Sequence, residues 1–197
     1  VTASAPGKLY LFGEHAVVYG EPAGDRTVEA RDDDHLRVDA EDLTLDGFTV
    51  EYGRTPSDDP DVDVSESLIE AATGYVDAAV AQARDAADAP DAGFDVTIES
   101  EIPLGAGLSS SAAVTVAAIY AATRELGVEL TPREVADRAY RAEYEVQDGN
   151  ASRPDTFCSA TGGAVRVEGE DRRSLDAPEL PLVVGFDGGA GDTGALV

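Results

Sequence analysis

Apolar residues recur at helical spacing in two long stretches of the chain. Residues 65–86 place a set of apolar side chains on one helical face, namely Leu68, Ile69, Ala72, Val76 and Val80. An alanine-rich stretch that follows Ser111 predicts a second helix, which ends near Gly127. Both stretches are long enough to bury one face against a sheet or another helix.

A third helix is indicated by its capping residues rather than by its apolar positions. Thr131, Pro132 and Glu134 have the order of an N-cap, a first-turn proline and the acid of a capping box. This helix is expected to run to about Gln147, and a short helix is expected after the loop that contains Asp155.

Alternating or short apolar runs predict strands in much of the remaining chain. Residues 94–100 are the clearest case, since Phe94, Val96 and Ile98 share one face. Shorter strands are expected at residues 4–12, 27–31, 36–40, 43–52, 163–168 and 181–187. Glycine, proline and acidic runs predict loops at residues 13–25, 32–34 and 54–63. Strands, a helix, a strand, two helices and strands again indicate an α+β fold.

The chain is strongly acidic. Its 197 residues carry 40 acidic against 14 basic residues, a formal net charge of −26, and only one of the basic residues is a lysine. Because 43% of the residues are hydrophobic, a disordered acidic protein is excluded. The composition resembles that of proteins from halophilic archaea, where salt screens such a surface. It argues against binding to nucleic acids or anionic membranes through a basic patch.

Two further features concern the compartment. The single cysteine, Cys158, excludes a disulfide within the chain and fits a reducing interior. No apolar run approaches membrane-spanning length and no signal-peptide pattern is found. We therefore expect a cytoplasmic protein.

Residues 102–113, IPLGAGLSSSAA, have the pattern of a phosphate-binding loop between a strand and a helix. Gly105 and Gly107 allow close approach of the backbone, and three serines fall on the first helical turn, where free amides and the helix dipole favour anions. No Lys-Ser or Lys-Thr pair follows, so the loop is not a Walker A motif. The alternative is a glycine-containing turn in front of a capped helix.

Several acids and histidines could carry chemistry. Asp155 could be a catalyst, although an aspartate in such a loop is more often an N-cap. Glu143 and Glu145 lie near the end of the third predicted helix, where the dipole disfavours acids, so they either bind a cation or belong to the acidic surface. His15 could face a ligand, whereas His35, after three aspartates, is expected to be exposed.

Three motifs taken together resemble the GHMP kinases, and within them the mevalonate kinases. They are APGKLYLFGEHAVVYGEPA at residues 5–23, PLGAGLSSSAA at residues 103–113 and GNASRPDTFCSATGG at residues 149–163. Their order and spacing fit that family over essentially the whole chain. The resemblance implies ATP-dependent transfer of the γ-phosphoryl group to the 5-hydroxyl of mevalonate. A homodimer is an expectation at the level of the family only.

The resemblance also implies roles for residues. Asp155 would accept the hydroxyl proton, Lys8 would assist beside it, and Glu14 and His15 would contact the substrate. The ATP phosphates would be bound by the glycine- and serine-rich segment, that is by Gly105, Ala106, Gly107, Leu108, Ser109, Ser110 and Ser111. Mg²⁺ would be held by Ser111 and Glu143. Counting back from Asp155 with the spacing usual in the family reaches Tyr144, and allowing one inserted residue gives Glu143, which is therefore preferred to Glu145.

The same resemblance sets expectations for the architecture. Residues 1–187 would form the N-terminal ATP- and substrate-binding domain, a mixed sheet packed with helices and containing a left-handed βαβ unit. Residues 188–197 would begin a truncated C-terminal domain. The segment after Pro22-Ala23 is shorter than is usual in the family. The alternatives are another GHMP small-molecule kinase, such as a phosphomevalonate kinase, or an inactive fragment or ligand-binding relative.

Overall fold

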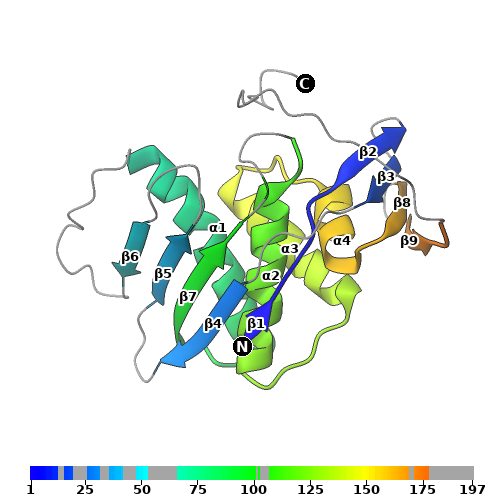
Figure 1. Ribbon diagram of the computed structural model, residues 1–197. Coiled ribbons are helices and arrows are strands. Elements are labelled where there is room, and N and C mark those ends of the chain that lie inside the picture. Colours follow the sequence, from blue (N-terminus) through cyan, green and yellow to red (C-terminus); the bar gives the residue numbers. More distant parts are fainter. Residues whose placement is uncertain are drawn as a thin grey trace.

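A computed structural model of the chain describes residues 1–12, 16–19, 26–31, 36–41, 48–52, 66–100, 102, 107–168 and 171–177. The helices are α1 (Glu66–Ala87), α2 (Ser110–Glu125), α3 (Pro132–Val146) and α4 (Arg153–Thr161). The strands are β1 (Thr2–Ala3), β2 (Leu9–Phe12), β3 (Ala16–Tyr19), β4 (Arg26–Arg31), β5 (Leu36–Glu41), β6 (Phe48–Tyr52), β7 (Gly93–Glu99), β8 (Ala164–Glu168) and β9 (Asp171–Leu175). Figure 1 shows these elements as a sheet on one side, the helices behind it, and two short strand pairs at the other side.

The sheet has the strand order β1-β4-β7-β5-β6. Among the described strands, β5 and β7 form the parallel pair, and every other pairing is antiparallel. A parallel pair requires a crossover, which here contains β6 and α1. The mixed sheet with helices confirms the α+β expectation. The left-handed sense of this βαβ unit stays a prediction.

The core between the sheet and the helices follows the alternation read from the sequence. Phe94, Val96 and Ile98 of β7 are buried and pack against Val76 and Val80 of α1. A second core lies among the helices and β8, where small side chains of α2 allow close approach of α3 and α4. Its members include Ala113, Ala117, Ala136, Ala139, Phe157 and Val165. The first core supports the sheet, and the second holds the N-terminal ends of α2 and α4 in place.

Away from the sheet, two strand pairs lie beside α4. β2 pairs with β3 and β8 pairs with β9, both antiparallel, and β3 contacts β8 and α4. Arg172 connects β9 to α3 and α4. Its buried guanidinium donates from Nη1 to Asp137 Oδ1 of α3 at 2.6 Å and lies over the Phe157 ring of α4.

Several sequence predictions are confirmed and others are wrong. The four predicted helices are confirmed, and so is the capping box of Thr131 and Glu134 at the start of α3. The loop predicted at residues 13–25 is wrong at residues 16–19, which form β3, and β9 was not predicted. The predicted strand at 181–187, the turn at 32–34, the connector at 54–63 and the segment at 20–25 fall outside the described residues. Within the described residues, no helix is long and apolar enough to cross a membrane.

Candidate active site

Asp155 lies in the first turn of α4, which begins at Arg153 and so includes part of the segment expected to be a loop. The N-cap is Ser152, whose hydroxyl accepts a hydrogen bond from the Asp155 amide at 3.4 Å. The Asp155 carboxylate is therefore not the helix cap, and it contacts two other segments instead. Lys8 Nζ lies 3.3 Å from Oδ1, and Ser109 Oγ donates to Oδ2 at 2.5 Å. Residues from the start, middle and end of the chain thus meet at one carboxylate.

Lys8 is held in the interior. It is 7% exposed, which is rare for a lysine unless its charge is paired, as it is here with Asp155. Its amide donates to the Leu108 carbonyl at 3.0 Å, which joins the first segment to the serine-rich loop. The preceding residue must be small, because a Cβ on Gly7 would lie 2.7 Å from that same carbonyl oxygen and 3.1 Å from Ile102 Cδ1. Gly7 therefore permits the hydrogen bond between the Lys8 amide and the Leu108 carbonyl, which fixes the position of the Lys8 backbone.

The N-terminus of α2 has the features of a cradle for an anion. Gly107 has a φ of 72°, no atom of the described residues lies within 4 Å of its would-be Cβ, and Ser109 is the N-cap with a left-handed backbone. Ser109 does not use its side chain to cap the helix, and no acid lies in the first turn. Ser110 and Ser111 are in that turn, so two of the three serines lie where the sequence placed them. Gly105 and Ala106 fall outside the described residues.

Glu143 is the most deeply buried carboxylate described near this cradle, at 2% exposure. Burial raises its pKa from 4.5 to about 7, a hydrogen bond with Ser111 opposes this, the Asp155 charge raises it further and Lys8 lowers it. Glutamate is rarely buried unless its charge is compensated. Among the described residues of this cluster, two carboxylates face one lysine, so negative charge is in excess.

That excess fits a divalent cation. Hydroxyl and carboxylate oxygens are the ligands that Mg²⁺ prefers, and Ser111 and Glu143 bring one of each together. In the described ranges no group of three His, Cys, Asp or Glu side chains gathers as a metal site. An ion held by these two oxygens would complete its coordination with water and phosphate oxygens, which is the usual mode for magnesium.

The structure separates the two glutamates that the sequence left open. Glu143 faces the interior and Glu145 is exposed, because residues two apart on a helix do not share a face. Tyr144, the residue reached by the uncorrected count, is 50% exposed. Glu14, His15 and His35 lie outside the described residues, so their predicted roles stay predictions.

Tyr75 of α1 is a site neighbour that sequence reasoning missed. Burial raises the pKa of its hydroxyl, the charge of Glu143 raises it further, and hydrogen bonds with Gln147 and Ser111 oppose both. Its hydroxyl therefore contacts Ser111, one of the two residues proposed for the cation, and lies within the electrostatic influence of the other, Glu143. In the sequence, Tyr75 cannot be distinguished from other aromatic residues of amphipathic helices. The packing of α1 against α2 and α3 is what places it beside Ser111.

Cys158 lies one turn after Asp155 and is fully buried. Burial raises the pKa of its thiol to about 12, the Asp155 charge adds to this and Lys8 opposes it. A thiol that stays protonated is a poor nucleophile. Cys158 is thus a packing residue behind the carboxylate.

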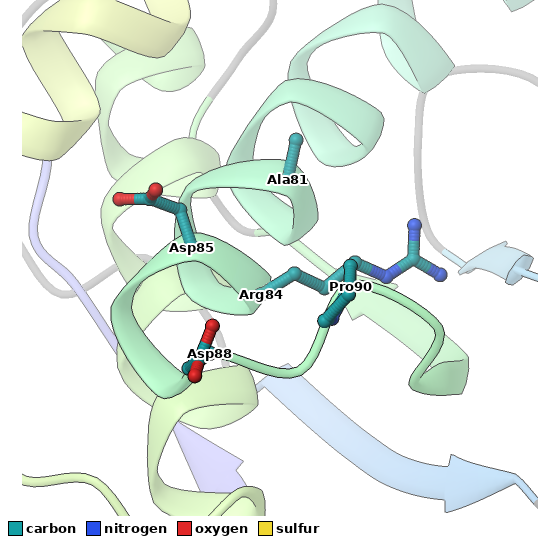
Figure 2. A pocket seen from close by; sticks show the side chains of 5 residues that line it. All are labelled: Ala81, Arg84, Asp85, Asp88 and Pro90. Atoms are coloured by element: carbon teal, nitrogen blue, oxygen red, sulfur yellow. The ribbon is translucent and has the colours of Figure 1, made fainter.

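A surface pocket lies at the other end of α1, lined by Ala81, Arg84, Asp85, Asp88 and Pro90 (Figure 2). Two of its charged side chains, those of Arg84 and Asp85, have partners in the fold. Arg84 Nε donates to the Ala92 carbonyl at 2.8 Å, and Asp85 pairs with Arg138 of α3 at 2.8 Å. Arg84 is nine residues beyond Tyr75, about 13 Å along the helix axis. The pocket is separate from the Lys8–Asp155 cluster.

Comparison with known proteins bears on the same segments. Residues 74–163 match the family described as GHMP kinases N terminal domain. The chain is 39% identical over its whole length to a mevalonate kinase of Thermococcus gammatolerans, of which it covers 60%. It is 38% identical to that of Pyrococcus furiosus, with the same coverage. It thus spans about three fifths of the length of these relatives.

Solved structures agree at the level of the fold. The crystal structure of the Methanococcus jannaschii mevalonate kinase aligns with 90% of this chain and 56% of its own, with a TM-score of 0.71 and 23% identity. Another mevalonate kinase crystal structure aligns with 89% of this chain at a TM-score of 0.69. The architecture, the matched segment and the sequence relatives point the same way. The chain carries a GHMP kinase N-terminal domain, matched over residues 74–163.

Proposed function

We propose that the protein transfers the γ-phosphoryl group of ATP to the 5-hydroxyl of mevalonate. The observation that carries the proposal is the convergence of Lys8, Ser109 and Asp155 beside the open N-terminus of α2. The relatives named above, which are mevalonate kinases, support the choice of substrate. Because the chain spans 60% of those relatives, the activity is proposed for the full-length protein.

On the acceptor side, Asp155 is the proposed base. As the substrate oxygen attacks the γ-phosphorus, its proton passes to a carboxylate oxygen of Asp155. The bond from the γ-phosphorus to the bridging oxygen breaks, and ADP leaves. The Lys8 ammonium, 3.3 Å from Oδ1, can attract the negative charge that develops on the substrate oxygen. Phosphoryl transfer depends mostly on such positioning and charge stabilisation.

On the donor side, the first turn of α2 would hold the phosphates. The amides of Ser110 and Ser111 precede the first helical hydrogen bonds, and the helix dipole favours an anion at this end. Ser111 and Glu143 would hold Mg²⁺, which when bound supplies charge neutralisation to the phosphate oxygens. This arrangement binds ATP without a basic patch, which suits a chain of net charge −26.

The test is ADP release by the full-length protein in molar KCl with ATP and Mg²⁺. Mevalonate should support turnover, whereas phosphomevalonate, homoserine and galactose should not. Asp155→Asn should lower kcat by about 10²- to 10⁴-fold, the usual contribution of a positioned base. Asp148→Asn is the matched control, because Asp148 is exposed and asparagine tolerates its φ of 48°. Turnover with phosphomevalonate alone would assign a different kinase.

We also propose that the acidic composition is an adaptation to high salt, since a net charge of −26 on 197 residues repels itself unless ions screen it. A cytoplasmic location stays a prediction of the sequence features, and a homodimer stays a prediction of the family resemblance.

A further inference from the structure

Ser109 occupies the N-cap of α2 but does not behave as an N-cap. Serine at this position ordinarily accepts a hydrogen bond from an amide of the first turn. Here no such bond is made, and the backbone has φ 60° and ψ 46°, a left-handed conformation instead of the extended one usual for a cap. By contrast, Thr131 of α3 and Ser152 of α4 have extended backbones and cap their helices with their side chains.

The Ser109 hydroxyl is instead turned to Asp155. Its Oγ donates to Oδ2 at 2.5 Å, across 46 residues of sequence. Lys8 contacts the other carboxylate oxygen at 3.3 Å. The carboxylate is thereby held at both oxygens, which fixes its rotation about the Cβ–Cγ bond. An ionised carboxylate oxygen offers two lone pairs, so a hydrogen bond to it does not by itself prevent the group from accepting a proton.

The left-handed backbone makes the choice of serine informative. Glycine adopts this conformation at no steric cost, whereas a residue with a Cβ is strained there. A serine at Ser109 therefore needs a compensating contact, and the hydrogen bond to Asp155 is the contact that the structure provides.

Lys8 is tied to the same segment by a second route. Its amide donates to the carbonyl of Leu108, the residue before Ser109. The two groups that flank Asp155 thus both depend on residues 108–109, which lead directly into the first turn of α2. A shift of this segment would move the base, its cationic neighbour and the phosphate cradle together.

We propose that Ser109 is a positioning residue whose hydroxyl orients the Asp155 carboxylate and ties it to the loop that would hold the ATP phosphates. This inference rests on the proposed function, in which Asp155 is the base. Ser109 sets the angle at which the base meets the acceptor hydroxyl, and it keeps that hydroxyl in line with the phosphorus.

The test compares Ser109→Gly and Ser109→Ala in the full-length protein. Both variants lose the hydroxyl and keep the backbone amide, but only glycine also relieves the left-handed strain. Both should lower kcat by about 10- to 100-fold, the contribution expected of a hydrogen bond to a charged group. The KM for each substrate should change by less than about threefold, since binding in the ground state is retained. The glycine variant should melt at or above the wild-type temperature, and the alanine variant below the glycine one.

The matched control is Asp88→Gly. Asp88 has the same left-handed backbone, with a φ of 51°, and lines the separate pocket at the end of α1 (Figure 2). This variant should melt at or above the wild type and keep its kcat. A loss of kcat in the two Ser109 variants without a loss of melting temperature in Ser109→Gly would separate positioning from folding.

Failure of the inference and failure of the proposed function can be told apart. If the wild type does not phosphorylate mevalonate, or if Asp155→Asn keeps wild-type turnover, the proposed function falls and takes the inference with it. If those two behave as expected but Ser109→Gly has wild-type kcat, the inference alone is overturned. It is also overturned if Ser109→Ala is slow while Ser109→Gly is normal, because the backbone would then be the cause.

Discussion

Replacing Glu143 by glutamine should stabilise the protein at alkaline pH when no divalent cation is present. The carboxylate is 2% exposed, and burial is the main reason that its pKa rises from 4.5 to about 7. The amide has nearly the same shape, can still accept the hydrogen bond from Ser111 and carries no charge. The substitution therefore removes the cost of burying an ionised group and changes little else.

The size of the effect follows from the pKa. One unit corresponds to about 1.4 kcal/mol, so a rise from 4.5 to about 7 amounts to about 3 kcal/mol at pH values well above 7. Because the folded state has the higher pKa, it holds the proton more tightly than the unfolded state. The stability linked to Glu143 is thus fully present below about pH 4.5 and is lost as the pH rises through about 7.

The assay is urea unfolding of the wild type and Glu143→Gln at pH 5 and pH 8.5, at constant KCl and with a chelator. The free energy of unfolding of the variant should exceed that of the wild type by roughly 2–3 kcal/mol at the higher pH, and the difference should shrink at the lower one. Glu145→Gln is the control, since Glu145 is exposed two residues away on the same helix. Its difference from the wild type should be small at both pH values.

Adding Mg²⁺ tests the other half of the reasoning. A cation that binds only the folded state raises stability with its concentration, so the wild type and Glu145→Gln should gain stability and Glu143→Gln should not. Equal differences between Glu143→Gln and the wild type at pH 5 and pH 8.5 would refute the buried-charge argument. A magnesium response in Glu143→Gln equal to that of the wild type would refute the assignment of the ligand.

Three other substitutions or conditions give sharp expectations. Lys8→Arg should lower kcat by about 10²-fold, because a guanidinium is bulkier and spreads its charge, so it cannot replace a buried ammonium 3.3 Å from Asp155. Steady-state kinetics would check this, and near-normal turnover would contradict it. Gly7→Ala should lower both the melting temperature and kcat, because the new Cβ would lie 2.7 Å from the Leu108 carbonyl and must displace Lys8. Its control is Ser4→Ala, a change at an exposed position nearby, which should leave both quantities unchanged. Lowering KCl from molar to millimolar should reduce the melting temperature, since the net charge of −26 would be less screened; an unchanged melting curve would count against salt adaptation.

The sequence predicted those parts of the fold whose local pattern and tertiary environment agree. The alternation at Phe94, Val96 and Ile98 specified a strand with one buried face, and that face is buried. The capping box at Thr131 was equally readable, because it depends on residues three apart. Such features need no knowledge of distant segments.

The strands that were missed lack such a pattern. β9 has the sequence DRRSL, whose charges suggest a loop. Arg172 is nevertheless buried, because its guanidinium pairs with Asp137 of α3 and packs on the Phe157 ring of α4. β3 lies in a segment bounded by glycines, and its strand character depends on pairing with β2. In both cases a tertiary partner outweighs the local propensity.

The candidate site was predicted in part. Lys8 and Asp155 were paired through the family resemblance, and they lie 3.3 Å apart. Glu143 was preferred to Glu145 only through a family count that needed an inserted residue, and the buried face of α3 is what distinguishes the two in the structure. The contacts of Ser109 with Asp155 and of Tyr75 with Ser111 join elements distant in sequence, so no spacing rule could have given them.

Asp155, held by Lys8 and Ser109, is the proposed acceptor of the mevalonate proton during phosphoryl transfer. A single turnover of the full-length protein with γ-labelled ATP, wild type against Asp155→Asn, tests this by following label into mevalonate. We expect label on the 5-oxygen at a rate at least about 10²-fold higher in the wild type. Label that never reaches mevalonate, or that reaches it equally fast in Asp155→Asn, would contradict this proposal.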